Sequence, residues 1–131
     1  MKRVTVLLPT LDEAEGIAEV VPRIPTAELH SAGWEVEVLV VDGGSDDGTI
    51  EIAKKLGCET MRQHGKGKGV AMRQGFASFL RGENDVLVMF DADGTYHPEE
   101  LLRFLKALRH ADVVVGDRLK GEMDPDAMTR V

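Results

Sequence analysis

Hydrophobic residues along the chain gather in short continuous runs, separated by longer segments in which polar and apolar residues mix. Five runs are predicted to be buried strands, because apolar residues follow one another without the strict alternation of a half-exposed strand. They cover residues 3–9, 35–42, 58–62, 85–91 and 111–117. Strands with this pattern are typical of a parallel sheet that is covered on both faces.

Helices are predicted between these runs. Thr10 and Glu13 have the spacing of a capping box, so the first helix is expected to begin there and to end before Pro25. Asp46 or Asp47 can cap the next helix. The remaining predicted helices cover residues 49–56, 70–80 and 98–109. Strand and helix thus alternate, which predicts an open α/β fold.

Charged residues follow the predicted strands. In open α/β sheets ligands bind beyond the carboxyl ends of the strands, so residues from different strands meet at one edge. The charged residues expected at this edge are Asp12, Asp42, Asp91, Asp93 and Arg118.

Composition narrows the class of protein. The chain has 131 residues, 43% hydrophobic and 30% charged, which fits one globular domain. A formal net charge of −7 argues against a nucleic-acid-binding surface. The single cysteine, Cys58, is expected to be a small buried residue. No helix is predicted to cover the last strand, so we expect the N-terminal part of a longer protein.

Asp91 and Asp93 end an apolar run one residue apart, and two like charges at a strand end predict a cation. Their side chains point the same way, about 7 Å apart. One or both can hold a hard divalent ion while leaving room for phosphate oxygens. The alternative is a loop in which aspartates cap the backbone.

Two further segments are candidates for nucleotide binding. Asp42 ends another strand, where a carboxylate can accept hydrogen bonds from a ribose or a base; the alternative is a turn rich in Asp and Gly. Residues 65–69 read GKGKG and open a helix, so backbone amides and two lysines can attract phosphate. This segment is not a Walker loop, because Val70 follows Gly69. Its alternative is a solvated turn.

The segment 91–95, DADGT, resembles the first motif of the haloacid-dehalogenase phosphohydrolases. That resemblance implies Asp91 as nucleophile, Asp93 as general acid and Mg²⁺ as cofactor. The family places this motif on an early strand and uses a later lysine, for which only Lys106 or Lys120 remains. It also gives residues 40–49 no role.

The whole chain, 1–131, resembles family 2 glycosyltransferases of the GT-A fold, a Rossmann-like and mostly parallel sheet with helices on both faces. The matching segments, in order, are VLLPTLDEAEGI (6–17), VVDGGSDDGT (40–49), GKGKGVAMRQGF (65–76), DADGTYHPEEL (91–101) and VVVGDRL (113–119).

The resemblance implies site residues and a cofactor. Nucleotide contacts are expected from Pro9, Thr10, Glu13, Asp42, Gly67, Lys68, Asp91 and Ala92. Mg²⁺ or Mn²⁺ is expected on Asp91 and Asp93. The residues expected to act in catalysis are Asp91, Asp93, Arg118 and Arg130, the arginines by binding the acceptor phosphate.

Two departures from the family pattern shape the substrate prediction. Gly43 replaces a common second Asp, which leaves base contacts to Asp42. Thr95 replaces the Gln often found in dolichyl-phosphate mannosyltransferases. Residues 119–131 contain GEMDPDAM, which resembles the acceptor loop of archaeal dolichyl-phosphate hexosyltransferases. Glucose is therefore favoured over mannose.

The predicted function is a metal-dependent, inverting transfer of a hexose from UDP-glucose or GDP-mannose to a polyprenyl phosphate. A phosphate acceptor is already anionic and needs no general base, and the sequence shows no convincing base. The enzyme is expected at the cytoplasmic face of the membrane, in peripheral contact with it. The alternatives are transfer to a sugar hydroxyl, the phosphohydrolase reading, and a nucleotide-binding fragment without turnover.

Overall fold

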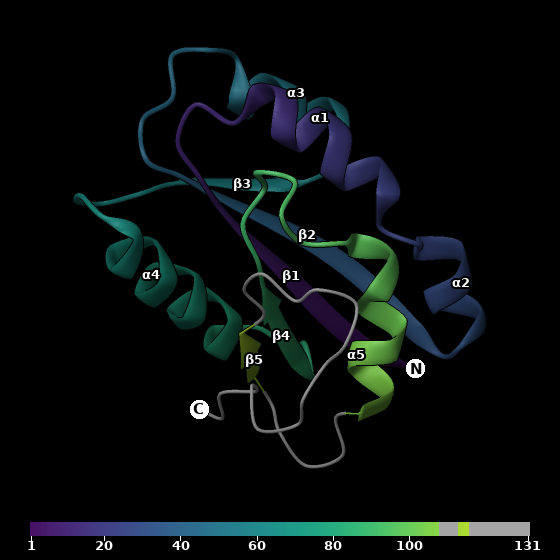
Figure 1. Ribbon diagram of the computed structural model, residues 1–131. Coiled ribbons are helices and arrows are strands. Elements are labelled where there is room, and N and C mark those ends of the chain that lie inside the picture. The colour runs from purple at the N-terminus through teal and green to yellow at the C-terminus, as the bar shows by residue number, and fades with distance from the viewer. Residues whose placement is uncertain (108–112, 116–131) are drawn as a thin grey trace.

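Five parallel strands form the centre of the fold in a computed structural model, which describes residues 1–107 and 113–115 (Figure 1). The strand order is β3-β2-β1-β4-β5. The strands are β1 (Lys2–Thr10), β2 (Trp34–Asp42), β3 (Glu59–Arg62), β4 (Val86–Met89) and β5 (Val113–Val115). The predicted parallel α/β sheet is therefore confirmed.

The strand order places a crevice at one edge of the sheet. After β1 the chain adds β2 and β3 on one side, and it then returns to add β4 and β5 on the other. Such a reversal opens a ligand site at the carboxyl ends of the two strands that flank it. Here those strands are β1 and β4, whose register pairs Leu7 with Met89. Strands β1 and β2 end level, with Thr10 beside Asp42.

Helices cover both faces of the sheet (Figure 1). They are α1 (Ala14–Arg23), α2 (Thr26–Ser31), α3 (Thr49–Lys55), α4 (Lys68–Arg81) and α5 (Leu101–Ala107), with a 3₁₀ turn η1 (Pro98–Glu100) before α5. Alternate residues of β1 face opposite layers. Val6 and Leu8 pack in the cluster that includes residues of α1, α2, α3 and α5, whereas Leu7 packs in the cluster with α4.

The structure corrects one local prediction, adds a helix that was not predicted, and decides between two candidate caps. Thr10 is not a helix cap: it ends β1, its hydroxyl hydrogen-bonds Asp42, and α1 begins only at Ala14. Helix α2 was not predicted, because six residues with one buried side chain, Leu29, show no readable period. Asp47, rather than Asp46, accepts a hydrogen bond from the first amide of α3.

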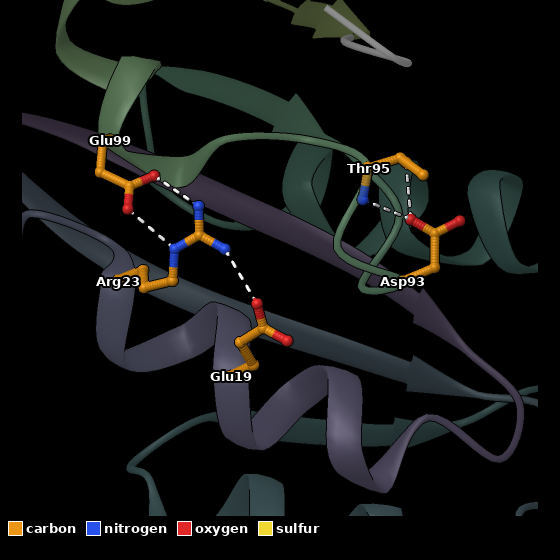
Figure 2. A network of polar contacts seen from close by, with 5 residues as sticks. All are labelled: Glu19, Arg23, Asp93, Thr95 and Glu99. Carbon is orange, nitrogen blue, oxygen red and sulfur yellow. Dashed lines mark hydrogen bonds and ion pairs between the residues drawn. The ribbon is translucent and has the colours of Figure 1, made fainter.

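Helix α1 holds the segment that follows β4. Figure 2 shows Arg23 of α1 donating two hydrogen bonds to Glu99 of η1, both 2.8 Å long, and a longer one to Glu19. These groups are partly exposed, so the ion pair orients the two elements more than it stabilises them. Near the other end of α1, a Cβ on Gly16 would lie 1.8 Å from the Ala92 carbonyl oxygen. Glycine at this position therefore lets the helix pack directly on the Asp91–Asp93 turn.

Cys58 is buried in the core, as expected. Among the described helices, none combines the length and the apolar character that crossing a bilayer requires.

Gly75 of α4 should be sensitive to enlargement. A Cβ at this buried position would lie 2.5 Å from a Leu7 methyl carbon. We expect Gly75→Val to lower the free energy of unfolding by about 1–3 kcal/mol through overpacking, measured by urea denaturation with an unchanged slope. Gly69→Ala is the matched control, because its nearest atom is an Arg73 nitrogen 3.8 Å away. Equal destabilisation by both variants would contradict this packing.

Candidate functional site

A pocket of about 480 Å³ lies at the carboxyl edge of the sheet. Its volume is in the usual range for a small-molecule site. The pocket is lined by Pro9, Thr10, Leu11, Glu13, Gly43, Gln63, Lys66, Gly67, Lys68, Ala71 and Asp91. A cavity of similar size, about 510 Å³, lies among residues such as Arg3 and Glu35 at the opposite edge, where sheets of this topology do not bind ligands.

Most of the predicted nucleotide-binding residues meet in this pocket. They are Pro9, Thr10, Glu13, Gly67, Lys68 and Asp91. Asp42 and Ala92 are not among the lining residues, and neither is Asp93. Lys66, one of the two lysines expected near phosphate, lines the pocket as well, whereas sequence reasoning missed Leu11, Gly43, Gln63 and Ala71 as lining residues. All but Gln63 stand inside a quoted motif, whereas Gln63 lies between motifs and carried no signal.

Asp42 is buried beneath the pocket rather than exposed in it. Asp42 is only 1% exposed to solvent. Oδ1 accepts hydrogen bonds from the hydroxyls of Thr10 (2.8 Å) and Ser45 (2.5 Å), and Oδ2 accepts from the amides of Ser45 (2.8 Å) and Gly44 (3.0 Å). A carboxylate offers about four acceptor sites, so these bonds occupy it.

The same hydrogen bonds set the ionisation of Asp42. Burial raises the pKa of this carboxyl, but the bonds donated by Ser45, Thr10 and Gly44 together outweigh burial. The pKa of Asp42 therefore lies below its usual range, and the group is a carboxylate at neutral pH.

The loops after β1 and β2 are joined by further hydrogen bonds. The amide of Asp12 donates to the Ser45 hydroxyl (2.7 Å), and the amide of Asp46 donates to the Asp12 carboxylate (2.9 Å). Asp12 has a positive φ of 52°, which Asp tolerates better than most residues. The predicted rim residue Asp12 thus fixes one loop to the next.

Two glutamines hold the glycine-rich loop at the mouth of the pocket. The Gln63 amide nitrogen donates to the carbonyls of Gly65 (3.1 Å) and Gly67 (2.8 Å). Gln74 accepts from the His64 amide (2.8 Å) and donates to the Arg62 carbonyl (2.6 Å). Gln63 therefore holds the loop that carries Lys66 and Lys68, and Gln74 holds the segment that leads into it.

Asp91 pairs with an ammonium group, whereas the divalent ion expected on Asp91 and Asp93 stays a prediction. The Lys68 Nζ lies 2.6 Å from one carboxylate oxygen of Asp91 and 2.8 Å from the other. Asp93 is arranged differently: its Oδ1 accepts from the amide (3.0 Å) and the hydroxyl (2.6 Å) of Thr95 (Figure 2). These bonds from Thr95 lower the pKa of Asp93 and leave Oδ2 available.

The acidic groups around the pocket fit a hard divalent ion. Burial, followed by the charges of Asp93, Asp91 and Asp47, raises the pKa of Glu13, which reports a negative field at this edge. Within residues 1–107 and 113–115, no three acidic, His or Cys side chains form a metal cluster. A divalent ion held by one or two carboxylates, with phosphate oxygens completing its shell, matches the way proteins bind Mg²⁺.

A doubly wound parallel sheet with a pocket at its reversal point is the arrangement in which α/β domains bind ligands. Residues 5–131 match the model of the family described as "Glycosyl transferase family 2", so the chain belongs to this family. The match sets aside the phosphohydrolase reading of the DADGT segment.

Two curated relatives show how the length of this chain compares with that of similar proteins. It is 39% identical over 129 residues to "Glycosyltransferase AglJ" of Haloferax volcanii, covering 98% of this chain and 40% of that protein. It is also 39% identical over 122 residues to "Undecaprenyl-phosphate mannosyltransferase" of Micrococcus luteus, covering 88% and 48%. The chain thus spans less than half the length of these relatives.

A solved structure supports the fold. Glucosyl-3-phosphoglycerate synthase from Mycobacterium tuberculosis, in complex with Mn²⁺, UDP and glucosyl-3-phosphoglycerate, superposes with a TM-score of 0.62 at 26% identity. The superposition covers 77% of this chain and 37% of that chain. The predicted GT-A fold is therefore confirmed. Arg118, Arg130 and the predicted acceptor loop 119–131 lie outside the described residues.

Replacing Asp42 by Asn should destabilise the fold in a pH-dependent way. Asn presents two N–H donors to groups that themselves donate, so we expect a loss of about 1–3 kcal/mol near neutral pH. Because folding lowers the pKa of Asp42, its stabilisation is present above the unfolded-state pKa of about 3.9 and is lost as the pH falls through the folded-state pKa.

The measurement is urea denaturation of wild type and Asp42→Asn from about pH 3 to pH 7. The difference between the two should shrink below about pH 4. Asp46→Asn, which changes an exposed residue of the same loop, is the control. A difference that stays constant with pH would contradict a stabilising charge at Asp42.

Proposed function

We propose that this chain binds the donor in a metal-dependent, inverting hexosyltransferase. The hexose moves from a nucleoside-diphosphate sugar to a polyprenyl phosphate. The observation that carries this proposal is the pocket itself, a space of about 480 Å³ that is lined by Lys66, Lys68 and Asp91. Lysines that can bind phosphate, beside a carboxylate that can bind a metal ion, suit a diphosphate.

The glycine-rich loop is assigned to the diphosphate. Its conformation is set by positive φ angles at Gly65 and Gly67, and Gln63 bridges the carbonyls of both residues. Lys68, paired with Asp91 in this structure, is close enough to exchange that carboxylate for a phosphate oxygen. The acidic surroundings, including Glu13, leave the pocket short of positive charge until a metal ion arrives.

Asp93, with support from Asp91, is assigned to hold Mg²⁺ or Mn²⁺. The ion, when bound, stabilises the negative charge of the leaving diphosphate. Thr95 occupies one oxygen of Asp93 with two hydrogen bonds and thereby fixes the orientation of the carboxylate. Lys68 neutralises Asp91 in the absence of the ion. The synthase from Mycobacterium tuberculosis, with Mn²⁺ and UDP bound, supports this assignment.

The acceptor is assigned from chemistry and from relatives. A phosphate monoester is anionic near neutral pH, so the chain needs no general base. The printed name of the Micrococcus luteus relative includes undecaprenyl phosphate. Arg118 and Arg130 are proposed to bind the acceptor phosphate, by the resemblance of their segments to the family pattern.

Glucose is placed before mannose because Thr95 stands where mannosyltransferases often have Gln. Peripheral contact at the cytoplasmic face of the membrane follows from such an acceptor.

Asp93→Ala should abolish the metal dependence of nucleotide binding. Asp93 is the residue assigned to hold the metal ion. In the variant we therefore expect the gain in UDP or GDP affinity on adding Mn²⁺ to disappear, measured by isothermal titration calorimetry. Asp85→Ala is the control, because it removes the same charge at the amino end of β4, where Asp85 accepts a hydrogen bond from Arg3. Unchanged metal dependence in Asp93→Ala would show that the metal site is misassigned.

The reaction is tested with the complete protein, Mn²⁺ or Mg²⁺, and a panel of radiolabelled UDP-glucose and GDP-mannose. We expect label in a polyprenyl phosphate fraction, with UDP-glucose the better donor. Replacing Arg118 or Arg130 by Ala should lower this transfer by about 10² or more, as loss of a charge-stabilising contact does. Transfer to a sugar hydroxyl instead, or binding without any transfer, would contradict the proposed acceptor.

A further inference from the structure

Gln63 has a side-chain amide whose orientation is fixed by its surroundings. Both hydrogens of Nε2 are directed at carbonyl oxygens, those of Gly65 and Gly67. A flipped amide would turn its oxygen toward two acceptors, which would repel it. The backbone of Gln63 is fixed as well, because its main-chain N–H donates to the main-chain carbonyl of Asp42 (2.8 Å). This bond directly follows the last paired residues of β2 and β3, Asp42 and Arg62.

The remaining group, the Gln63 carbonyl oxygen Oε1, faces Gly43. A Cβ at Gly43 would lie 3.3 Å from this oxygen, and both residues line the pocket. Glycine at 43 leaves the approach to Oε1 open. The side of the pocket formed by the ends of β2 and β3 therefore offers a hydrogen-bond acceptor of fixed direction.

Asp42, the sequence-predicted reader of the base, does not offer one. Its carboxylate is occupied by Thr10, Gly44 and Ser45, and its residue is 1% exposed. A base contact to Asp42 would have to displace one of these bonds. The displaced hydroxyl or amide would then lack an acceptor, and leaving a buried donor unpaired is costly.

We infer that the Gln63 carbonyl oxygen, reached over Gly43, accepts a hydrogen bond from a ring N–H of the donor's base. This role rests on the proposed nucleotide-sugar function. Uracil and guanine carry a ring N–H on their pairing edge, whereas cytosine and adenine carry a ring acceptor there. The pocket thus selects uridine or guanosine diphosphates over cytidine and adenosine diphosphates, and Asp42 positions the loop from beneath.

The test compares each nucleotide with a derivative that lacks the ring N–H. Wild-type protein is titrated by calorimetry, with Mn²⁺, against UDP and N3-methyl-UDP and against GDP and N1-methyl-GDP. For the nucleotide that binds, methylation should weaken binding about tenfold or more, as loss of one hydrogen bond at a desolvated site does. In Gln63→Ala the methylated and unmethylated forms should bind equally, because the acceptor and its bulk are both removed.

Gln74→Ala is the matched control for loop anchoring. Gln74 anchors the segment that leads into the loop, through His64 and Arg62, but does not line the pocket. This variant should weaken binding of the unmethylated nucleotide while keeping the preference over the methylated form. Asp42→Asn should keep the preference as well.

Three outcomes would overturn the inference. Equal binding of both forms by wild type would exclude a ring N–H contact, whatever the variants do. If Gln74→Ala as well as Gln63→Ala loses the preference for the unmethylated nucleotide, Gln63 only supports the loop. If Asp42→Asn loses this preference, Asp42 is the residue that contacts the base. A wild-type protein that binds neither UDP nor GDP would instead overturn the donor site, and hence the proposed function.

Discussion

The carboxylate of Asp42 is the interaction on which the shape of the pocket depends. It stands at the end of β2 and joins this strand to two further pieces of backbone: the end of β1, through Thr10, and the following turn, through Gly44 and Ser45. Buried hydrogen bonds to a charged acceptor are stronger than neutral ones. The two loops that Asp42 joins line one side of the pocket, so a shift of this side chain would move several pocket residues together.

The acidic groups at this edge of the sheet are partly neutralised by a lysine before a ligand binds. The chain is acidic overall, with a formal net charge of −7, and Glu13, Asp91 and Asp93 crowd the same edge. Lys68 offsets part of this charge by pairing with Asp91. A diphosphate with a divalent ion would replace that pair by two new ones, Lys68 with phosphate and Asp91 with the ion. The exchange gives both Lys68 and Asp91 a new partner of opposite charge, so binding leaves neither charge unpaired.

The sequence predicted what depends on burial and not what depends on side-chain hydrogen bonding. Strands β1, β2 and β4 are covered on both faces, and a strand in that position consists mostly of consecutive apolar residues. The sequence therefore predicted them. The strand order then brought Asp42 and Asp91 to one edge. Thr10 was misread as a helix cap because a hydroxyl can satisfy a helix or a neighbouring carboxylate, and spacing alone does not separate the two.

Gln63 was missed for the same physical reason. Its significance comes from two carbonyls turned toward it by the positive φ angles of Gly65 and Gly67, and a residue type alone does not reveal such an arrangement. The motif-based reading gave base recognition to Asp42, the only charged residue at the end of β2. In the folded chain a neutral amide, held in one orientation, is the better reader of a neutral base, because it presents its acceptor without burying an unpaired charge. The charged groups of the pocket are then left for the charged part of the donor, its diphosphate.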